Sequence, residues 1–264
     1  MTAPRPGGLE DHVRRRLERK RILLMAHAVV GYPSLDENWR MLEAMEAAGV
    51  DLVELQLPFS EPIADGPIFV KANQAAADAH LAWGDYFDFL GRAAGSFSFP
   101  LLFMGYYNSI FRMGEETFCE RLAAAGGRGC IVVDLPPEEA GGLHAKARGL
   151  GVDPVLLMTP TNSPRRLEEI ARQASGFVYC VARKGVTGAR TDFTRGVEAF
   201  LARCRSSTGL PLALGFGIKT PDDVRAVRGL ADIAVVGTAC LESWERDGPA
   251  GYTRFLADLA AETL

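Results

Sequence analysis

Two acidic residues, Glu54 and Asp65, lie close together in the sequence but in very different surroundings. Glu54 lies inside an apolar run typical of a buried strand, whereas Asp65 follows Pro58 and Pro62 in a segment typical of a loop. In a strand covered on both faces Glu54 would be buried, and burial raises the pKa of a carboxyl until it can donate a proton near neutral pH. Asp65 is expected to stay ionised. The two surroundings therefore predict two chemical roles.

Each acid also has a purely structural interpretation. Glu54 could partner a buried arginine or backbone amides, and Asp65, which precedes Gly66, could simply form a turn. The two residues taken alone leave these interpretations open. The organisation of the rest of the chain favours the chemical interpretation.

Short apolar runs alternate with helical patterns, which is typical of parallel strands joined by crossover helices. Eight strands are predicted, over 22–30, 51–58, 100–107, 129–135, 154–159, 176–182, 211–216 and 233–236. The clearest helices between them are predicted over 36–48, 115–125, 163–174 and 220–227. Eight such units predict an α/β fold, a (β/α)8 TIM barrel with parallel strands and an extra N-terminal helix, forming one domain over residues 1–264. A doubly wound open sheet is the alternative.

A barrel carries its chemistry at the carboxyl ends of its strands, and Glu54 is expected near such an end, on the interior face that it shares with Gln56. The last two predicted strands run into glycines, at Gly217 and at Gly237, which Thr238 follows. Glycine lets backbone N–H groups approach a ligand, and a helix N-terminus adds its positive end. After the seventh and eighth strands of a barrel the bound anion is usually phosphate. Either glycine alone is a weak signal, but the pair predicts a phosphate site.

The composition excludes several classes of protein. A formal net charge of −4 gives no broad basic surface for nucleic acid, and the basic cluster over 14–21 is interpreted as a solvated helix face. No apolar run reaches membrane-spanning length and no signal peptide opens the chain, so a cytoplasmic protein is expected. The 5 cysteines are scattered and are expected to be free, mostly buried thiols. The 4 histidines show no ligand spacing, so no metal is expected.

Five segments resemble the tryptophan synthase alpha subunit family, in order and with matching spacing over nearly the whole chain. They are PFSEPIADGP at 58–67, YYN at 106–108, DLPPEE at 134–139, GVTG at 185–188 and GFGI at 215–218. The first and fourth are highly specific to that family, whereas the glycine pairs occur in many phosphate-binding barrels. The resemblance implies a (β/α)8 lyase that cleaves indole-3-glycerol phosphate to indole and glyceraldehyde 3-phosphate.

This reaction needs one proton delivered to the indole ring carbon and one removed from a chain hydroxyl, which a buried carboxyl can do in sequence. The resemblance gives that role to Glu54, and it gives Asp65 the stabilisation of positive charge on the indole nitrogen. Tyr179 matches a tyrosine beside the acid. The remaining matching positions concern the substrate: Tyr106 and Phe216 line the pocket, Gly188, Gly217, Gly237 and Thr238 bind phosphate, and Thr187 lies in a loop that orders over the substrate.

The chain also departs from the family's commonest pattern. Gln56 stands in place of a glycine, Glu61 of an aspartate, Thr238 of a serine, and His27 of an apolar aromatic residue. Gln56 is the departure most able to disturb the pocket, because its side chain shares the interior face with Glu54. His27 is interpreted as a barrel-wall histidine with satisfied hydrogen bonds, and Lys219 as an exposed lysine.

The resemblance further implies a partner, the tryptophan synthase beta subunit, in an α2β2 heterotetramer. Pyridoxal phosphate is expected on that partner only, and no cofactor on this chain, because no lysine here has a clear Schiff-base setting. The alternatives are a stand-alone indole-3-glycerol phosphate lyase and a catalytically weak activator subunit. The presence of both Glu54 and Asp65 argues against the activator.

Overall fold

The computed structural model describes residues 7–182, 190–215 and 217–264 of the chain. Within these ranges, nine parallel strands form one sheet in the order β5-β4-β3-β2-β1-β9-β8-β7-β6. Their bounds are β1 Leu23–Val29, β2 Leu52–Gln56, β3 Leu101–Gly105, β4 Gly129–Val132, β5 Asp153–Pro154, β6 Leu156–Met158, β7 Val178–Cys180, β8 Leu212–Gly215 and β9 Ile233–Val236.

The two edge strands of this sheet are consecutive in the chain. β5 pairs with β4 and β6 pairs with β7, and only Val155 separates β5 from β6. The fifth predicted strand therefore touches both edges and closes the sheet into a barrel. This confirms the prediction of a (β/α)8 barrel with eight strand positions and excludes the open sheet, although the predicted strand over 154–159 is broken into two short pieces.

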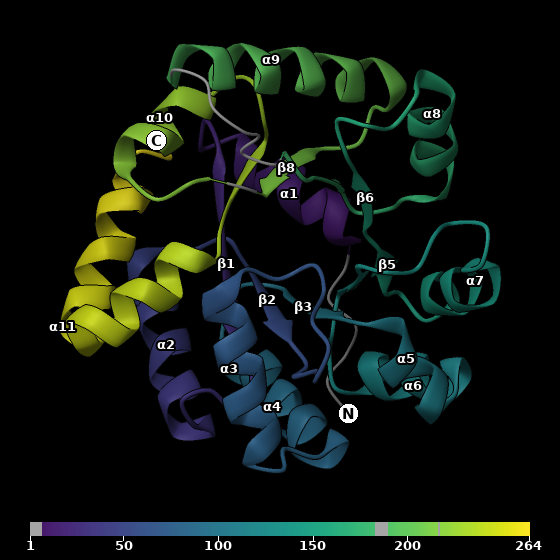
Figure 1. Cartoon of the computed structure of the whole chain (residues 1–264), viewed down its shortest axis with the longest axis vertical. Coiled ribbons are helices and arrows are strands. Elements are labelled where there is room, and N and C mark those ends of the chain that lie inside the picture. Colours follow the sequence, from purple (N-terminus) through teal and green to yellow (C-terminus); the bar gives the residue numbers. More distant parts are fainter. Residues whose placement is uncertain (1–6, 183–189, 216) are drawn as a thin grey trace.

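The helices form a ring around the strands (Figure 1). Their bounds are α1 Leu9–Leu17, α2 Leu35–Ala48, α3 Pro67–Asp78, α4 Trp83–Ser96, α5 Tyr107–Met113, α6 Glu115–Ala124, α7 Gly141–Gly149, α8 Pro164–Gln173, α9 Arg190–Ser207, α10 Pro221–Val227 and α11 Thr238–Ala261. Among the described residues, none of these helices has the length and apolarity needed to cross a bilayer.

Local sequence signals explain where several helices begin. The Ser163 hydroxyl accepts a hydrogen bond from the Arg166 backbone N–H, and Pro164 occupies the first turn of α8. The Thr220 side chain accepts from the Asp223 backbone N–H, and the Asp223 carboxylate accepts from the Thr220 N–H in return, which is a capping box. The helices predicted over 163–174 and 220–227 are confirmed as α8 and α10.

The strand residues alternate between two apolar regions. Leu23 and Met25 of β1 point into the barrel, where they pack with Leu52 of β2, whereas Leu24 and Ala26 face the surrounding helices. The extra N-terminal helix α1 adds Leu9 and Val13 to the interior and lies at the centre of the ring in Figure 1. In the same register Glu54 and Gln56 follow Leu52 on the interior face, as predicted.

The basic cluster at the N-terminus differs from its prediction. Lys20 is only 12% exposed, and its ammonium lies 2.8 Å from the buried carboxylate of Asp51. Arg16 donates to the same carboxylate from Nε at 2.7 Å, and the Leu24 backbone N–H donates at 2.9 Å. Arg16 and Lys20 therefore do not belong to a purely solvated helix face. They neutralise a buried acid at the start of β2, because a buried charge without partners would be costly.

Candidate active site

Glu54 and Asp65 belong to one continuous chain of polar contacts at the carboxyl ends of the strands. In order, this chain runs Tyr179, Glu54, His27, Gln56, Asp65 and Tyr106. Its members come from β1, β2, β7 and the loops that follow β2 and β3. Two acids that are eleven positions apart in the sequence are thus joined through a histidine and an amide. We call this set the polar chain.

Glu54 is almost fully buried, with 1% of its surface exposed. Its Oε1 lies 3.1 Å from His27 Nδ1 and accepts a hydrogen bond of 3.3 Å from the Tyr179 hydroxyl. Its second oxygen, Oε2, has no hydrogen-bond partner among the described residues. Oε2 can therefore exchange a proton without first breaking an existing hydrogen bond.

His27 faces Glu54 because the two residues are register partners across β1 and β2. Burial lowers the pKa of His27, but the neighbouring carboxylates of Glu54 and Asp65, with hydrogen bonds to Glu54 and Gln56, raise it by more. The net result is a histidine pKa above its ordinary value. The ring also stacks on Phe69 of α3, with centroids 4.5 Å apart and planes 27° apart, which fixes its orientation.

Gln56 connects His27 to Asp65. Its Oε1 lies 2.9 Å from His27 Nε2, and its Nε2 donates to Asp65 Oδ2 at 2.7 Å. An ionised Asp65 can only accept hydrogen bonds, so it requires the NH2 end of the amide to face it and the carbonyl end to face the histidine. Gln56 was predicted to be the departure most able to disturb the pocket; in the structure it bridges His27 and Asp65.

Asp65 is held by two side chains from the barrel. Besides Gln56, the Tyr106 hydroxyl donates to Oδ2 at 3.1 Å, and the same hydroxyl accepts from the Ala64 backbone N–H at 3.1 Å. Burial raises the pKa of Asp65, while the hydrogen bond from Gln56, the charge of His27 and the hydrogen bond from Tyr106 partly offset that rise. Tyr106 was predicted to line the pocket, and its contacts with Ala64 and Asp65 also fix the loop after β2.

Tyr179 lies beside Glu54, as the resemblance implies. The ring fits because Gly215 has no side chain. Gly215 lies two residues after Ala213, the register partner of Tyr179 on β8, and a Cβ at Gly215 would lie 2.0 Å from Tyr179 Cε1. Burial, the charge of Glu54 and their hydrogen bond all raise the pKa of Tyr179 well above its ordinary value. Tyr179 is therefore a hydrogen-bond donor that stays neutral.

Of the glycines predicted to bind phosphate, two are described. Gly237 is the N-cap of α11, and a Cβ there would lie 3.5 Å from His27 Nδ1, so this helix start adjoins the polar chain. Thr238 is the first residue of α11, and Gly217 has a φ of 80°, which favours glycine. The other predicted site residues, Thr187, Gly188 and Phe216, lie outside the described residues and stay predictions.

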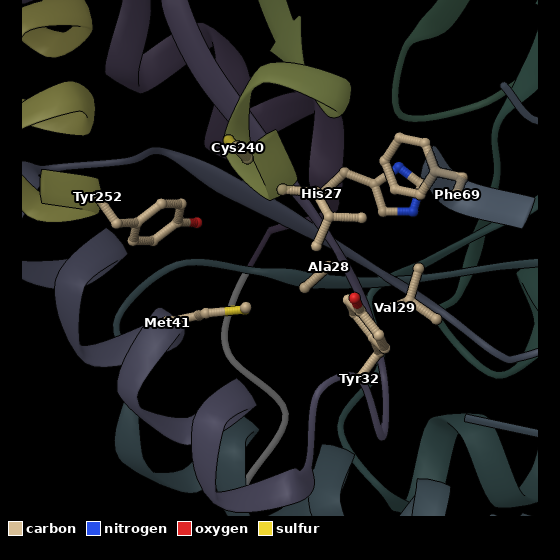
Figure 2. Close-up of a pocket in the computed structure, with 9 residues that line it drawn as sticks. His27, Ala28, Val29, Tyr32, Met41, Phe69, Cys240 and Tyr252 are labelled. Carbon is tan, nitrogen blue, oxygen red and sulfur yellow. The ribbon is translucent and has the colours of Figure 1, made fainter. Parts of the chain in front are cut away.

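A pocket lies behind His27, between β1 and the helices α2, α3 and α11 (Figure 2). Figure 2 shows the His27 ring lying against Phe69, with Cys240 and Tyr252 of α11 on another side of the pocket. Burial raises the pKa of Cys240 to about 12 and that of Tyr252 well above its ordinary value. These neighbours are neutral, so the charge around His27 comes from Glu54 and Asp65.

Sequence reasoning assigned His27 to the barrel wall and missed its pairing with the acid. The residue does have satisfied hydrogen-bonding groups, as interpreted, but one of its partners is Glu54 itself. The observed bounds place His27 and Glu54 each two residues before the ends of β1 and β2, whereas the predicted bounds, 22–30 and 51–58, place them at unequal depths and hide the pairing. Phe69, which orients the ring, carried no sequence signal, since α3 follows a loop whose path is not fixed by periodicity. Lys219 is 52% exposed, as interpreted, and lies 3.4 Å from Glu242.

The fold and the polar chain define a (β/α)8 barrel with a buried carboxyl, that of Glu54, at the carboxyl ends of its strands. The family model that describes the tryptophan synthase alpha chain matches residues 13–259. Relatives named tryptophan synthase alpha chain include one from Syntrophotalea carbinolica, 46% identical over 95% of this chain and 99% of its own length. Another, from Desulforapulum autotrophicum, is 45% identical over 96% of this chain and 100% of its own length.

Solved structures of tryptophan synthase are similar to this chain over nearly its whole length. Tryptophan synthase from M. tuberculosis superposes with a TM-score of 0.89 at 25% identity, covering 97% of this chain and 99% of that chain. The tryptophan synthase alpha chain from Legionella pneumophila gives a TM-score of 0.86 at 26% identity, with 97% of each chain covered. The chain belongs to the tryptophan synthase alpha chain family and has the alpha subunit role in tryptophan biosynthesis.

Proposed function

We propose that the chain cleaves indole-3-glycerol phosphate to indole and glyceraldehyde 3-phosphate, with Glu54 as the acid and base. The observation that carries this proposal is the buried Glu54, whose Oε2 is without a partner among the described residues and whose Oε1 is tied through the polar chain to Asp65. Neither the stand-alone lyase nor the weak activator is favoured by the family match.

In the proposed reaction Glu54 first donates a proton to the indole ring carbon that carries the glycerol chain. The positive charge then appears at the indole nitrogen, and the Asp65 carboxylate stabilises it. Glu54, now ionised, accepts the proton of the neighbouring chain hydroxyl while the carbon–carbon bond breaks. The electron pair of that bond returns to the ring, and the hydroxyl carbon becomes the aldehyde. One proton leaves Glu54 and one returns, so the group is regenerated.

The remaining site residues are proposed to hold the substrate. The phosphate is proposed to bind at the N-terminus of α11, at Gly237 and Thr238, because a helix start presents backbone N–H groups and positive charge. Gly217, in the loop after β8, is proposed to complete this site. Tyr179 holds Glu54 at Oε1, and Tyr106 holds Asp65. For Phe216, Thr187 and Gly188 the roles implied by the family resemblance are proposed unchanged.

We further propose that the chain works with a beta subunit in an α2β2 heterotetramer in the cytoplasm, and that the indole passes to that subunit. The chain itself needs no cofactor in this scheme. Pyridoxal phosphate would belong to the beta subunit.

The test is indole release from indole-3-glycerol phosphate by the purified chain, with and without a tryptophan synthase beta subunit. Glu54→Gln keeps the shape of the side chain and removes its proton exchange, and Glu198→Gln, at an exposed position of α9, is the matched control. We expect release that rises with the beta subunit, falls by about a hundredfold or more in Glu54→Gln and is unchanged in the control. Equal release by Glu54→Gln would refute the assignment of Glu54, and no release from the unaltered chain under either condition would refute the reaction.

A further inference from the structure

His27 and Gln56 lie between the two acids, with His27 in contact with Glu54 and Gln56 in contact with Asp65. His27 Nδ1 lies 3.1 Å from Glu54 Oε1, and Gln56 completes the path to Asp65 Oδ2 with contacts of 2.9 and 2.7 Å. Both side chains are buried, with 8% and 0% of their surfaces exposed. They point inward from the ends of adjacent strands, so the barrel itself fixes their distance.

The polarity of these contacts determines where protons lie. An ionised Asp65 directs the NH2 group of Gln56 toward itself, so the Gln56 carbonyl faces His27 and accepts from Nε2–H. With Nε2 protonated, Nδ1 is the position whose proton varies. When His27 is an imidazolium, Nδ1–H donates to Oε1 of an ionised Glu54. When His27 is neutral, Nδ1 accepts from the protonated carboxyl of Glu54. In both arrangements His27 and Glu54 together hold one proton between Nδ1 and Oε1.

We propose that His27 and Gln56 are positioning residues that make Glu54 and His27 share one proton. Asp65 determines which end of the Gln56 amide faces His27. The role in catalysis rests on the proposed lyase function, whereas the shared proton is a property of the chain without substrate. The pair holds the one proton that the ring carbon receives, and Glu54 passes it on through Oε2, the oxygen without a partner among the described residues. The proton taken from the chain hydroxyl restores it, so protons balance over the cycle.

Sharing has a consequence for pH dependence. A proton with two sites is lost at a higher pH than it would be from either site alone, because both arrangements stabilise the protonated pair. The titratable groups that face His27 are Glu54 on β2, Asp65 in the following loop, Cys240 and Tyr252 on α11, and Tyr32 after β1, with Tyr179 beyond Glu54. The pKa values of the cysteine and the tyrosines are raised. Near neutral pH the cysteine and the tyrosines around His27 therefore stay neutral.

The first experiment follows the imidazole of His27 by nitrogen-15 NMR in the full chain without substrate. The His27→Phe variant identifies the His27 signals by their absence. We expect His27 to be protonated at Nε2 throughout and to titrate above pH 6.5, the ordinary histidine value. In Glu54→Gln its midpoint should fall by about one pH unit or more, since the carboxylate partner is lost. An unchanged midpoint in Glu54→Gln would overturn the shared proton, whatever the activity.

The second experiment measures indole release against pH for the unaltered chain, His27→Phe and Gln56→Met. Phenylalanine keeps a ring against Phe69, and methionine keeps the length of Gln56, so thermal unfolding should still show folded proteins. We expect kcat to fall about tenfold in each variant with KM within about twofold, and the alkaline limb of kcat to move to lower pH by about one unit in His27→Phe. Active variants with the same pH profile would overturn the positioning role. A shifted NMR midpoint with no indole from any form would support the shared proton and refute the lyase reaction.

Discussion

Replacing Gly215 by alanine is expected to push Tyr179 away from Glu54. The new Cβ would lie 2.0 Å from Cε1, 2.6 Å from Cζ and 2.7 Å from the hydroxyl oxygen of Tyr179. Carbon atoms pack at about 3.5–4.0 Å, so the ring must retreat by about 1.5 Å. The hydrogen bond from the Tyr179 hydroxyl to Glu54 Oε1 is already 3.3 Å long, and such a displacement would break it. Gly215 is therefore required for the contact between Tyr179 and the acid.

The magnitude follows from the cost of overpacking a well-filled interior, about 1–3 kcal/mol. Urea unfolding followed by circular dichroism should show that Gly215→Ala lowers the free energy of unfolding by this amount when Tyr179 is present. In a Tyr179→Ala background the clashing ring is absent, so the same substitution should cost less than about 0.5 kcal/mol, within the additivity seen for independent sites. The coupling between the two positions separates a clash with the ring from a general effect of alanine in β8. Equal losses in both backgrounds would refute the reasoning.

Three further predictions concern other parts of the molecule. Asp51→Asn should lower the free energy of unfolding by about 1–3 kcal/mol, because Arg16 and Lys20 lose their shared buried carboxylate; urea unfolding checks this, and Asp36→Asn, in the first turn of α2, is a surface control. Burial raises the pKa of Asp65 above its ordinary value. If the proposed reaction holds, kcat should fall as the pH falls through this pKa, because protonated Asp65 no longer stabilises positive charge. The Asp65→Asn variant should be slow at every pH, and its pH profile should lack this acidic limb. All 5 cysteines are free and buried, so a thiol reagent at pH 8 should react slowly with the folded chain, even at Cys204, whose pKa is lowered by its hydrogen bond with Cys180. After unfolding the reagent should modify 5 thiols rapidly; rapid reaction of the folded chain would contradict the burial.

The sequence predicted the barrel well because its signals are local and periodic. Alternation in β2 placed Glu54 and Gln56 on the interior face, and the helix predicted over 220–227 is observed as α10, Pro221–Val227. Several strands were predicted too long at their carboxyl ends, as in 51–58 against Leu52–Gln56, because the apolar pattern continues past the assigned end of the strand. The strand predicted over 233–236 matches β9. Proline at position 58 cannot donate to a ladder, which accounts for the early end of β2.

The polar chain was harder to predict because it depends on contacts between segments that are distant in sequence. Tyr106 reaches Asp65 only because the loop after β2 folds back over β3, where Ala64 donates to the same hydroxyl. No periodicity determines such a path. The family resemblance supplied Glu54, Asp65 and Tyr179 as separate residues, but it could not describe the bridge between them, since the bridge is made from two positions at which this chain departs from the family's commonest pattern.

Those two departures are best understood as a single feature. A histidine at position 27 brings two ring nitrogens into the barrel, and an unpaired buried polar group costs about 1–3 kcal/mol. Gln56 supplies the acceptor for one nitrogen, and Glu54 supplies the partner for the other. Gln56 in turn brings a buried amide, whose two ends are satisfied by His27 and Asp65. Neither residue would be satisfied without the other, whereas an apolar ring with a glycine needs no such bridge. His27 and Gln56 therefore replace an apolar wall beside Glu54 with polar groups that can hold a proton, while Glu54 and Asp65 stay in place.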